Sequence, residues 1–410
     1  MRLSKLLVAS LILLAGCESL DRTLTNTERV LGSRTGRTVL DLATGKDPKL
    51  LVKERVDAYQ RDPQAVLRDL RTIQRDFNTI MTALTGRVRQ TWGEKEIKVP
   101  EQKKYVKYTQ NYMSRSVVDF DNGSIVVETL DEKAPKESLK NAIVTTLLTP
   151  DDPRSVDLFS DKAVTLTSER PPYLLGLVLD QQGQPIRTPA QAEAFAASTL
   201  NSAETRPVDQ NGAAKQALVV EIRMVANFSN RQAEKYRATV TKYAEQFKIS
   251  PSLIFAVIRT ESNFNPFAVS SAPAYGLMQL VPSSGGRDAY RKAKGKDTIP
   301  SREYLFDPEN NIELGSAYLN VLSYNLLEQI DNEVSREYCV ISAYNTGSGN
   351  VFKTFGNNSV SAVNQINSLE PPAVYDRLRN NLPYQETRDY LVKVVGFRKQ
   401  FVSLPESNGR

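Results

Sequence analysis

The chain has 410 residues, with 53 Lys and Arg against 47 Asp and Glu, and contains no histidine, which gives it a formal net charge of +6. The absence of histidine excludes Ser-His-Asp and Cys-His catalysis and the two-histidine zinc helix. With only two cysteines, a structural zinc site is not expected either, and we expect no metal and no cofactor. The modest positive charge suits an anionic polymer or a membrane surface. No Lys/Arg run suggests nucleic acid.

The N-terminus has the features of a targeting segment. Two basic residues lie within the first five positions, and an apolar run at 6–14 follows them. This run is much shorter than the ~20 residues that a membrane-spanning helix needs. We therefore interpret residues 1–16 as a cleaved signal peptide.

The signal ends in Leu14-Ala-Gly-Cys17, which resembles the lipobox of bacterial lipoproteins. The resemblance implies cleavage before Cys17, a diacylglyceryl group on its sulfur and acylation of its new amine. Several acyl chains anchor a protein stably where one chain does not. By the same resemblance, Glu18 favours the outer membrane, with the protein facing the periplasm. The alternative is a secreted protein in which this cysteine is a coincidence.

The residues after Cys17 alternate between helical and strand patterns up to about residue 228. A polar tether is expected at 17–45. Two β-rich runs lie on either side of Asp121-Asn-Gly123, and Asn-Gly between such runs predicts a hairpin. Further elements are expected as helices at 62–90, 136–148 and 188–200 and as strands at 173–179 and 217–225. The pattern predicts an α+β domain with an antiparallel sheet over 46–228.

Strand patterns stop after residue 228. Asp307-Pro308 and Ser335 are typical helix N-termini, and long polar loops are expected at 262–275 and 346–380. Helices are expected at 230–247, 251–261, 283–293, 308–330, 336–345 and 384–401. The second domain, 229–403, is therefore predicted to be all-α.

Glu261 occupies an unusual position in this second region. Its helix starts at Ser250-Pro251, a favourable N-cap and first position. Ile254, Val257 and Ile258 follow at i, i+3 and i+4, and Glu261 falls at i+7, on the same apolar stripe. Burial and the C-terminal end of the helix dipole should both raise its pKa, as a general acid requires. The alternative is a frayed last turn that points the carboxylate at water.

Three further segments stand out after Glu261-Ser262. They are Gly276-Leu-Met-Gln279, Ala343-Tyr-Asn345, and Glu386-Thr-Arg-Asp-Tyr390 at the start of the last helix. In this order, the four segments closely resemble the catalytic domain of the soluble-lytic-transglycosylase family, which has a goose-lysozyme-like fold. The resemblance covers about 230–403.

The first region resembles the N-terminal domain of membrane-bound members of this family. The residues that carry this resemblance include Trp92-Gly93, Tyr105-Val-Lys-Tyr108 and Val118–Gly123. This region shows no acid cluster of its own. We therefore expect it to position the catalytic domain or to bind a partner.

The family resemblance implies that Glu261 protonates the glycosidic oxygen between N-acetylmuramic acid and N-acetylglucosamine in peptidoglycan. The same carboxylate then takes the proton of the C6 hydroxyl, which attacks C1 and leaves a 1,6-anhydro ring. The expected substrate-binding residues are Ser262, Ser270, Met278, Gln279, Tyr344, Asn345 and Tyr390. Thr346 replaces the glycine that usually follows Ala-Tyr-Asn, which affects subsite detail.

Two alternatives stay open at this point. One is a lysozyme-type hydrolase on the same fold, which would need a second carboxylate. Asp288 and Glu303 are nearby in sequence, whereas Asp307 is better explained as an N-cap. The other alternative is a peptidoglycan-binding lipoprotein without catalytic activity.

Overall fold

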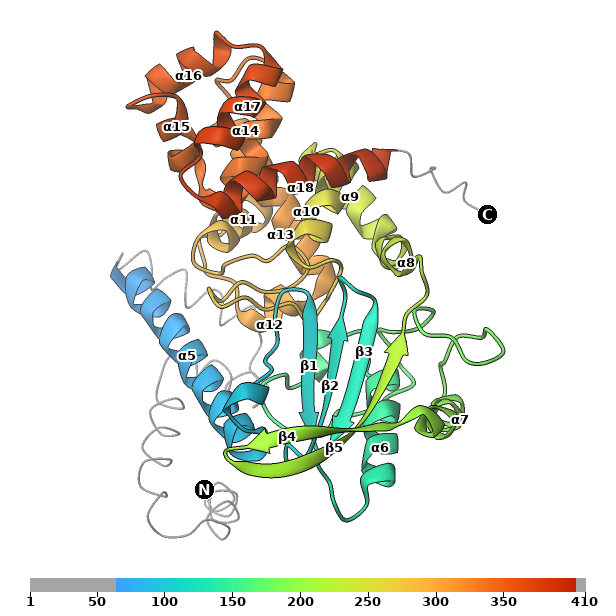
Figure 1. Ribbon diagram of the computed structural model, residues 1–410. Helices are drawn as coiled ribbons and strands as arrows, with labels where there is room; N and C mark the ends of the chain where they lie inside the picture. The colour runs from blue at the N-terminus through green and yellow to red at the C-terminus, as the bar shows by residue number, and fades with distance from the viewer. Residues whose placement is uncertain (1–63, 403–410) are drawn as a thin grey trace, which may run out of the picture. The chain divides into compact units, whose positions relative to one another are not determined.

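The computed structural model describes residues 64–402 (Figure 1). The signal peptide, the tether and Cys17 lie outside these residues. The chain divides after Thr79 into two units, of which the second, from Ile80 onward, contains the sheet and the helices that follow it. Helix α5, Gln64–Trp92, runs across this division and confirms the predicted helix at 62–90 over the described residues.

An antiparallel sheet of five strands forms the centre of the first region (Figure 1). In the sheet the strand order is β1-β2-β3-β5-β4. The strands are β1 Lys104–Thr109, β2 Ser114–Asp119, β3 Ser124–Thr129, β4 Glu204–Gln210 and β5 Ala213–Arg223. The predicted Asn-Gly hairpin is confirmed, because Asp119 pairs with Ser124 across the β2–β3 turn. The α+β fold of this region is therefore as predicted.

Helices cover this sheet and extend its core. Helix α6, Pro135–Leu148, buries Leu139 and Ile143, and the Thr146 hydroxyl on the same helix hydrogen-bonds Ser116 of β2. Trp92, at the end of α5, belongs to a cluster with residues of the sheet. The remaining elements are α7 Pro189–Thr199 and the short 3-10 helices η1 Glu94–Glu96, η2 Pro153–Ser155 and η3 Leu200–Ser202.

The predicted strand at 173–179 is wrong. These residues form successive turns, with Leu177 N–H donating to the Leu174 carbonyl, and Gly176 has a φ of 75°. Its apolar residues pack into the core from these turns, and Tyr173 is only 2% exposed. A short buried apolar run is not by itself a strand signal.

The second region is helical, as predicted. Its elements are α8 Phe228–Lys235, α9 Arg237–Phe247, α10 Pro251–Glu261, α11 Gly285–Lys294, α12 Arg302–Phe306, α13 Pro308–Val321, the π-turn η4 Leu322–Leu326, α14 Glu333–Thr346, α15 Ser348–Phe355, α16 Ser359–Asn367, α17 Pro371–Asn381 and α18 Gln385–Val402. The predicted helix at 230–247 is broken at Tyr236, and the one at 308–330 gives way to the π-turn. Asp307 caps α13 as expected, by accepting from Asn310 N–H, whereas Asn332, not Ser335, caps α14.

The predicted loop at 346–380 is the largest error, because this segment holds α15, α16 and α17. Each helix is short and mostly polar, with only two or three buried residues, so its apolar periodicity is weak. Val351 and Phe355, four residues apart, are the buried side of α15. Two of the helices begin with recognisable local signals. A capping box at Asn358 precedes α16, and Pro371 is the first residue of α17.

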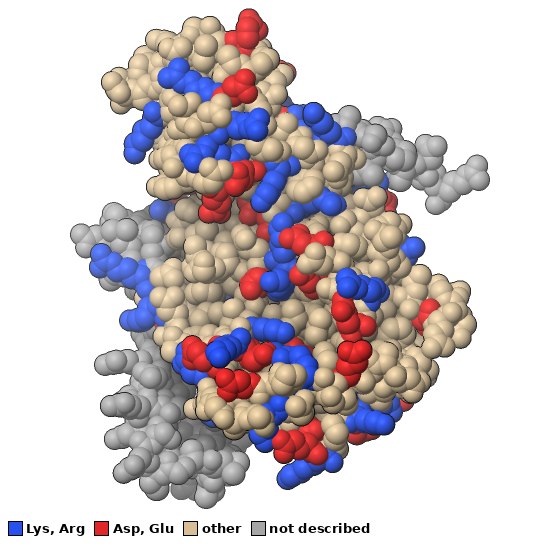
Figure 2. Space-filling model, in the orientation of Figure 1, with Lys and Arg blue, Asp and Glu red and all other residues tan. Residues whose placement is uncertain are grey.

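On one face of the molecule, charges of both signs are mixed. Figure 2 shows Lys and Arg interspersed with Asp and Glu on the face it presents. None of the described helices is both long and apolar enough to cross a bilayer.

Candidate active site

Glu261 is the last residue of α10, a helix that is buried along most of its length. Ile254, Val257 and Ile258 are fully buried, and Glu261 itself is partly buried. Ser262 follows at the C-cap, where the backbone leaves the helix. The apolar stripe therefore continues to the carboxyl group, and the interpretation as a frayed end that faces water does not hold.

Burial raises the pKa of Glu261 to about 8. A contact with the Tyr390 hydroxyl lowers this pKa, the negative charge of Glu386 raises it, and the positive charge of Lys103 lowers it. Desolvation is the largest of these effects, because a carboxylate loses its hydration when it is buried. The carboxyl group is therefore protonated at neutral pH and is able to donate a proton.

Two tyrosines from other helices approach this carboxyl group. Tyr390 of α18 is 6% exposed, and its hydroxyl has no well-formed hydrogen bond, although its weaker contact lowers the pKa of Glu261. Tyr344 of α14 donates from its hydroxyl to the Met278 carbonyl at 2.8 Å. Burial raises the pKa of each tyrosine well above its usual value, and the negative charge of Glu261 is the second largest cause. Both hydroxyls therefore stay neutral beside the acid.

The Gly276–Gln279 segment forms a tight turn that Asn311 of α13 holds in place. Asn311 accepts from Met278 N–H at 2.7 Å and donates to the carbonyls of Tyr275 and Leu305, both at 2.8 Å. Gly276 has a φ of 74°, and a Cβ there would lie 2.5 Å from the Asn311 amide nitrogen. Only glycine fits this turn, which explains the glycine of the motif.

Gln279 completes the turn with a strained backbone and an unused acceptor. Its φ is 47°, and its side-chain amide donates to the Gly276 carbonyl at 2.9 Å. Its Oε1 is buried without a partner among the described residues. A strained residue with a free acceptor is typical of a binding position, where a ligand donor completes the bonding.

The other predicted contact residues divide into two groups. Ser262 is fully buried and donates to the Leu277 carbonyl at 2.7 Å, and Met278 is fully buried against Gly315, so both shape the turn. Ser270 and Asn345 are partly exposed. Ser270 donates to the Ala272 carbonyl, while Asn345 accepts from the Thr387 hydroxyl at 2.7 Å.

A hollow of about 600 Å³ lies between the end of α14 and the start of α18. Asn345 of α14 and Glu386 and Thr387 of α18 line it, and the charge of Glu386 reaches Glu261. Glu386 and Thr387 belong to a segment that the sequence singled out, but only Tyr390 was assigned a role there. Asn311 was missed altogether, because a buried asparagine in a helix has no recognisable sequence pattern.

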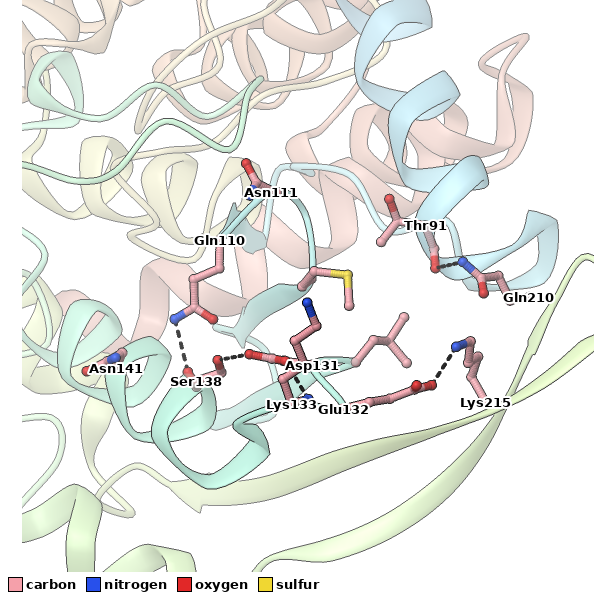
Figure 3. A pocket seen from close by; sticks show the side chains of 12 residues that line it. Thr91, Gln110, Asn111, Asp131, Glu132, Lys133, Ser138, Asn141, Gln210 and Lys215 are labelled. Atoms are coloured by element: carbon pink, nitrogen blue, oxygen red, sulfur yellow. Dashed lines mark hydrogen bonds and ion pairs between the residues drawn. The ribbon is translucent and has the colours of Figure 1, made fainter. Parts of the chain in front are cut away.

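A second hollow of about 610 Å³ lies in the α+β region (Figure 3). Several of its polar side chains bond to other residues of its lining. Ser138 donates to Asp131 at 2.5 Å, Gln110 donates to the Ser138 carbonyl at 3.1 Å, and Lys215 pairs with Glu132. We assign it no role. Among residues 64–402, no group of His, Cys, Asp or Glu could hold a metal ion.

Comparison with known families gives the class of the second region first. Residues 238–367 match the model of the transglycosylase SLT domain, and residues 69–235 match that of the membrane-bound lytic murein transglycosylase C N-terminal domain. The second region is thus the catalytic domain of a lytic transglycosylase. Tyr390 lies beyond the matched residues.

Relatives that align with most of the chain carry a more specific name. Membrane-bound lytic murein transglycosylase C from Yersinia enterocolitica is 40% identical over 352 residues, which cover 86% of this chain and 96% of the relative. The protein of the same name from Klebsiella pneumoniae is 42% identical over 325 residues, which cover 79% and 89%. The chain belongs to the membrane-bound lytic murein transglycosylase C family. A solved structure of the lytic transglycosylase Slt from Pseudomonas aeruginosa aligns with 44% of this chain and 26% of that one, at 27% identity and a TM-score of 0.34.

Proposed function

We propose that this lytic transglycosylase cleaves the β-1,4 bond between N-acetylmuramic acid and N-acetylglucosamine in peptidoglycan without water, using Glu261 alone as acid and then base. The observation that carries the proposal is the carboxyl group itself, held partly buried at a helix end with a pKa raised to about 8. One carboxyl group that is neutral first and anionic second is the requirement of this chemistry.

The reaction has two proton transfers at one group. The Glu261 carboxyl donates its proton to the glycosidic oxygen as the C1–O bond breaks. The carboxylate then takes the proton of the muramoyl C6 hydroxyl as its oxygen bonds to C1. The proton given to the leaving oxygen is replaced by the one taken from the C6 hydroxyl. The two products together therefore contain the same atoms as the substrate, and no water is consumed.

The surrounding residues support binding of an amide-rich glycan. Gln279 Oε1 offers an acceptor to an acetamido N–H, Asn345 lines the neighbouring hollow, and the partly exposed Ser270 is a further candidate contact. Tyr344 and Tyr390 stay neutral beside the acid, where they orient it and meet the reacting sugar. Ser262 and Met278 serve the site by holding the turn.

Product analysis in isotopic water tests the reaction class. We expect full-length protein in detergent to release muropeptides with 1,6-anhydromuramoyl ends from purified sacculi, with no ¹⁸O incorporated from H₂¹⁸O. A hydrolase would instead give reducing muramic acid ends that carry ¹⁸O. For hydrolysis, Glu386 is a candidate second carboxylate, because its charge acts on Glu261. Binding without product would indicate a non-catalytic protein.

We further propose that Cys17 carries the lipid anchor and holds the protein on the outer membrane, facing the periplasm. The support is the Leu-Ala-Gly-Cys run and the membrane-bound name of the relatives. Mass spectrometry of the purified protein should show an N-terminus at acylated Cys17. The Cys17→Ser variant should lose the acyl mass and leave the membrane fraction. An unmodified Cys17 in a protein that starts elsewhere would contradict the anchor.

The domain boundaries also stay a proposal, with residues 1–16 as the signal, 17–45 as the tether, 46–228 as the α+β domain and 229–403 as the catalytic domain. The boundary near 228 is supported by the change from strands to helices, since β5 ends at Arg223 and α8 begins at Phe228.

A further inference from the structure

The backbone directly after Glu261 is strained. Asn263 has a φ of 46° and Phe264 a φ of 63°, two successive left-handed residues without glycine. Such residues are rare, and they persist only where the surrounding structure holds them. Asparagine tolerates this conformation, but phenylalanine does so poorly. Contacts from outside this segment must therefore hold it in place, two residues after the acid.

The α+β region holds Asn263 through its side chain. The Asn263 amide donates to the Phe120 carbonyl at 2.5 Å and to Asp121 Oδ1 at 3.2 Å, both in the β2–β3 turn. Asn263 is 5% exposed, so these bonds are shielded from water. Phe264 is fully buried, with its ring stacked on Tyr236 at 6.4 Å.

The same turn brings a positive charge toward the acid. Lys103 Nζ lies 3.2 Å from Asp121 Oδ1, and Phe120 N–H donates to the Lys103 carbonyl at 3.0 Å. The charge of Lys103 is one of those that act on Glu261. The Asp121 carboxylate therefore contacts both Asn263 and Lys103.

A second set of contacts holds the following residues. Asn265 donates to the Gln102 carbonyl at 3.1 Å. The Phe267 ring packs against Tyr105 at 4.7 Å and Tyr173 at 5.0 Å. The segment after Glu261 is thus attached to the α+β region both before and after its turn.

We propose that Asn263 is a positioning residue, which fixes the end of α10 on the β2–β3 turn so that the Glu261 carboxyl keeps its orientation and its burial. The inference deepens the proposed function, since it rests on Glu261 as the acid. The charged and titratable groups that act on Glu261 are Lys103 from the α+β region, Glu386 and Tyr390 from α18, and Tyr344 from α14. The α+β region is therefore part of the catalytic apparatus rather than a spacer.

The Asn263→Gly variant separates the side chain from the backbone. Glycine adopts the left-handed conformation freely but removes both hydrogen bonds to the turn. We expect kcat to fall about 10- to 100-fold with KM unchanged, because small displacements of a reacting group have effects of this size. The pKa of Glu261 should move from about 8 toward its ordinary value, as the carboxyl group becomes hydrated. Asn263→Asp, which places an acceptor against two acceptors, should be worse.

Asn211→Gly is the matched control. Asn211, in the β4–β5 turn, is also left-handed, with a φ of 54°. Its side-chain amide donates to the Arg89 carbonyl of α5 at 3.1 Å. This variant should keep the wild-type kcat and pH profile. If Asn263→Gly folds poorly, Asp121→Ala removes one acceptor of Asn263 from a half-exposed position and should lower kcat about threefold, the value of one modest hydrogen bond. Lys103→Met, which removes the other partner of Asp121, separates this loss from the effect of the Lys103 charge.

Two readouts decide the inference. The first is the pH dependence of kcat on sacculi. The second is the titration of the Glu261 carboxyl by NMR with ¹³C-labelled glutamate, assigned by its loss in Glu261→Gln. Wild-type values in Asn263→Gly, or an equal loss in Asn211→Gly, would overturn the inference. If Glu261→Gln stays active, the proposed function fails, but the titration still shows whether Asn263 positions this carboxyl group.

Discussion

Glu261→Gln is expected to lower kcat by about 10²–10⁴-fold, the usual range for loss of a general acid–base group. Glutamine keeps the shape of the side chain, but its amide neither protonates the glycosidic oxygen nor accepts the C6 proton. The measurement is release of anhydromuropeptides from sacculi by purified full-length protein. Binding to sacculi should be retained, because the change leaves the turn at Gly276–Gln279 and its support by Asn311 intact.

Glu333→Gln is the matched control, since its side chain is 91% exposed at the start of α14. It should leave turnover unchanged. Unchanged turnover in Glu261→Gln would contradict the assignment of the acid.

The raised pKa of Glu261 has a stability consequence with a definite sign. In the folded protein the carboxyl group holds its proton up to about pH 8, whereas in the unfolded chain its pKa is near the ordinary 4.5. Between these values the folded state binds the extra proton, so rising pH destabilises it. Glutamine does not titrate. Glu261→Gln should therefore become more stable than the wild type as pH rises from about 5 to 8, with a constant difference above that. Thermal unfolding at pH 5, 7 and 9 measures this difference.

Activity should depend on pH through the same group. General-acid function needs the proton, so kcat/KM should fall as pH rises through about 8. A basic limb near 4.5 would mean that the carboxyl group is hydrated in the free enzyme.

Arg115→Met is expected to lower the free energy of unfolding by about 3–5 kcal/mol, as breaking a buried ion pair usually does. Arg115 and Glu128 are both fully buried, and Arg115 Nε donates to Glu128 Oε1 at 3.0 Å. The guanidinium also donates to Glu96 Oε2 at 2.7 Å and lies 3.8 Å above the Trp92 ring. Methionine would fill part of the space but would leave Glu128 with less compensation for its lost hydration.

Chemical denaturation measures the change, with Arg223→Met as control. Arg223 pairs with Glu221 on β5, where both side chains are at least half exposed, and such pairs contribute about 0–1 kcal/mol. Adding Glu128→Gln to Arg115→Met should recover part of the loss, since the two residues are coupled. A loss below 1 kcal/mol in Arg115→Met would show that Arg206 and Lys98 suffice to balance Glu128.

Local sequence patterns were enough to predict several secondary-structure elements and the position of the acid on its helix. The Pro251–Glu261 helix, the β2–β3 hairpin and the Asp307 cap were predicted at their observed places, because each depends on residues within one or two turns of one another. Errors arose where local signals were short or ambiguous. The helices at 348–381 have only two or three turns each, and the 173–179 segment is apolar through burial rather than through strand pairing.

By itself, the sequence determined that an acid lies on the apolar stripe of a helix, and that no histidine chemistry is available. Only the tertiary structure decided the partial burial of Glu261 and its raised pKa, because the groups that act on its carboxyl come from α18 and from the α+β region. The bond from Asn263 to Phe120 joins residues 143 positions apart. Such contacts arise from the packing of whole domains, and no spacing along the chain encodes them.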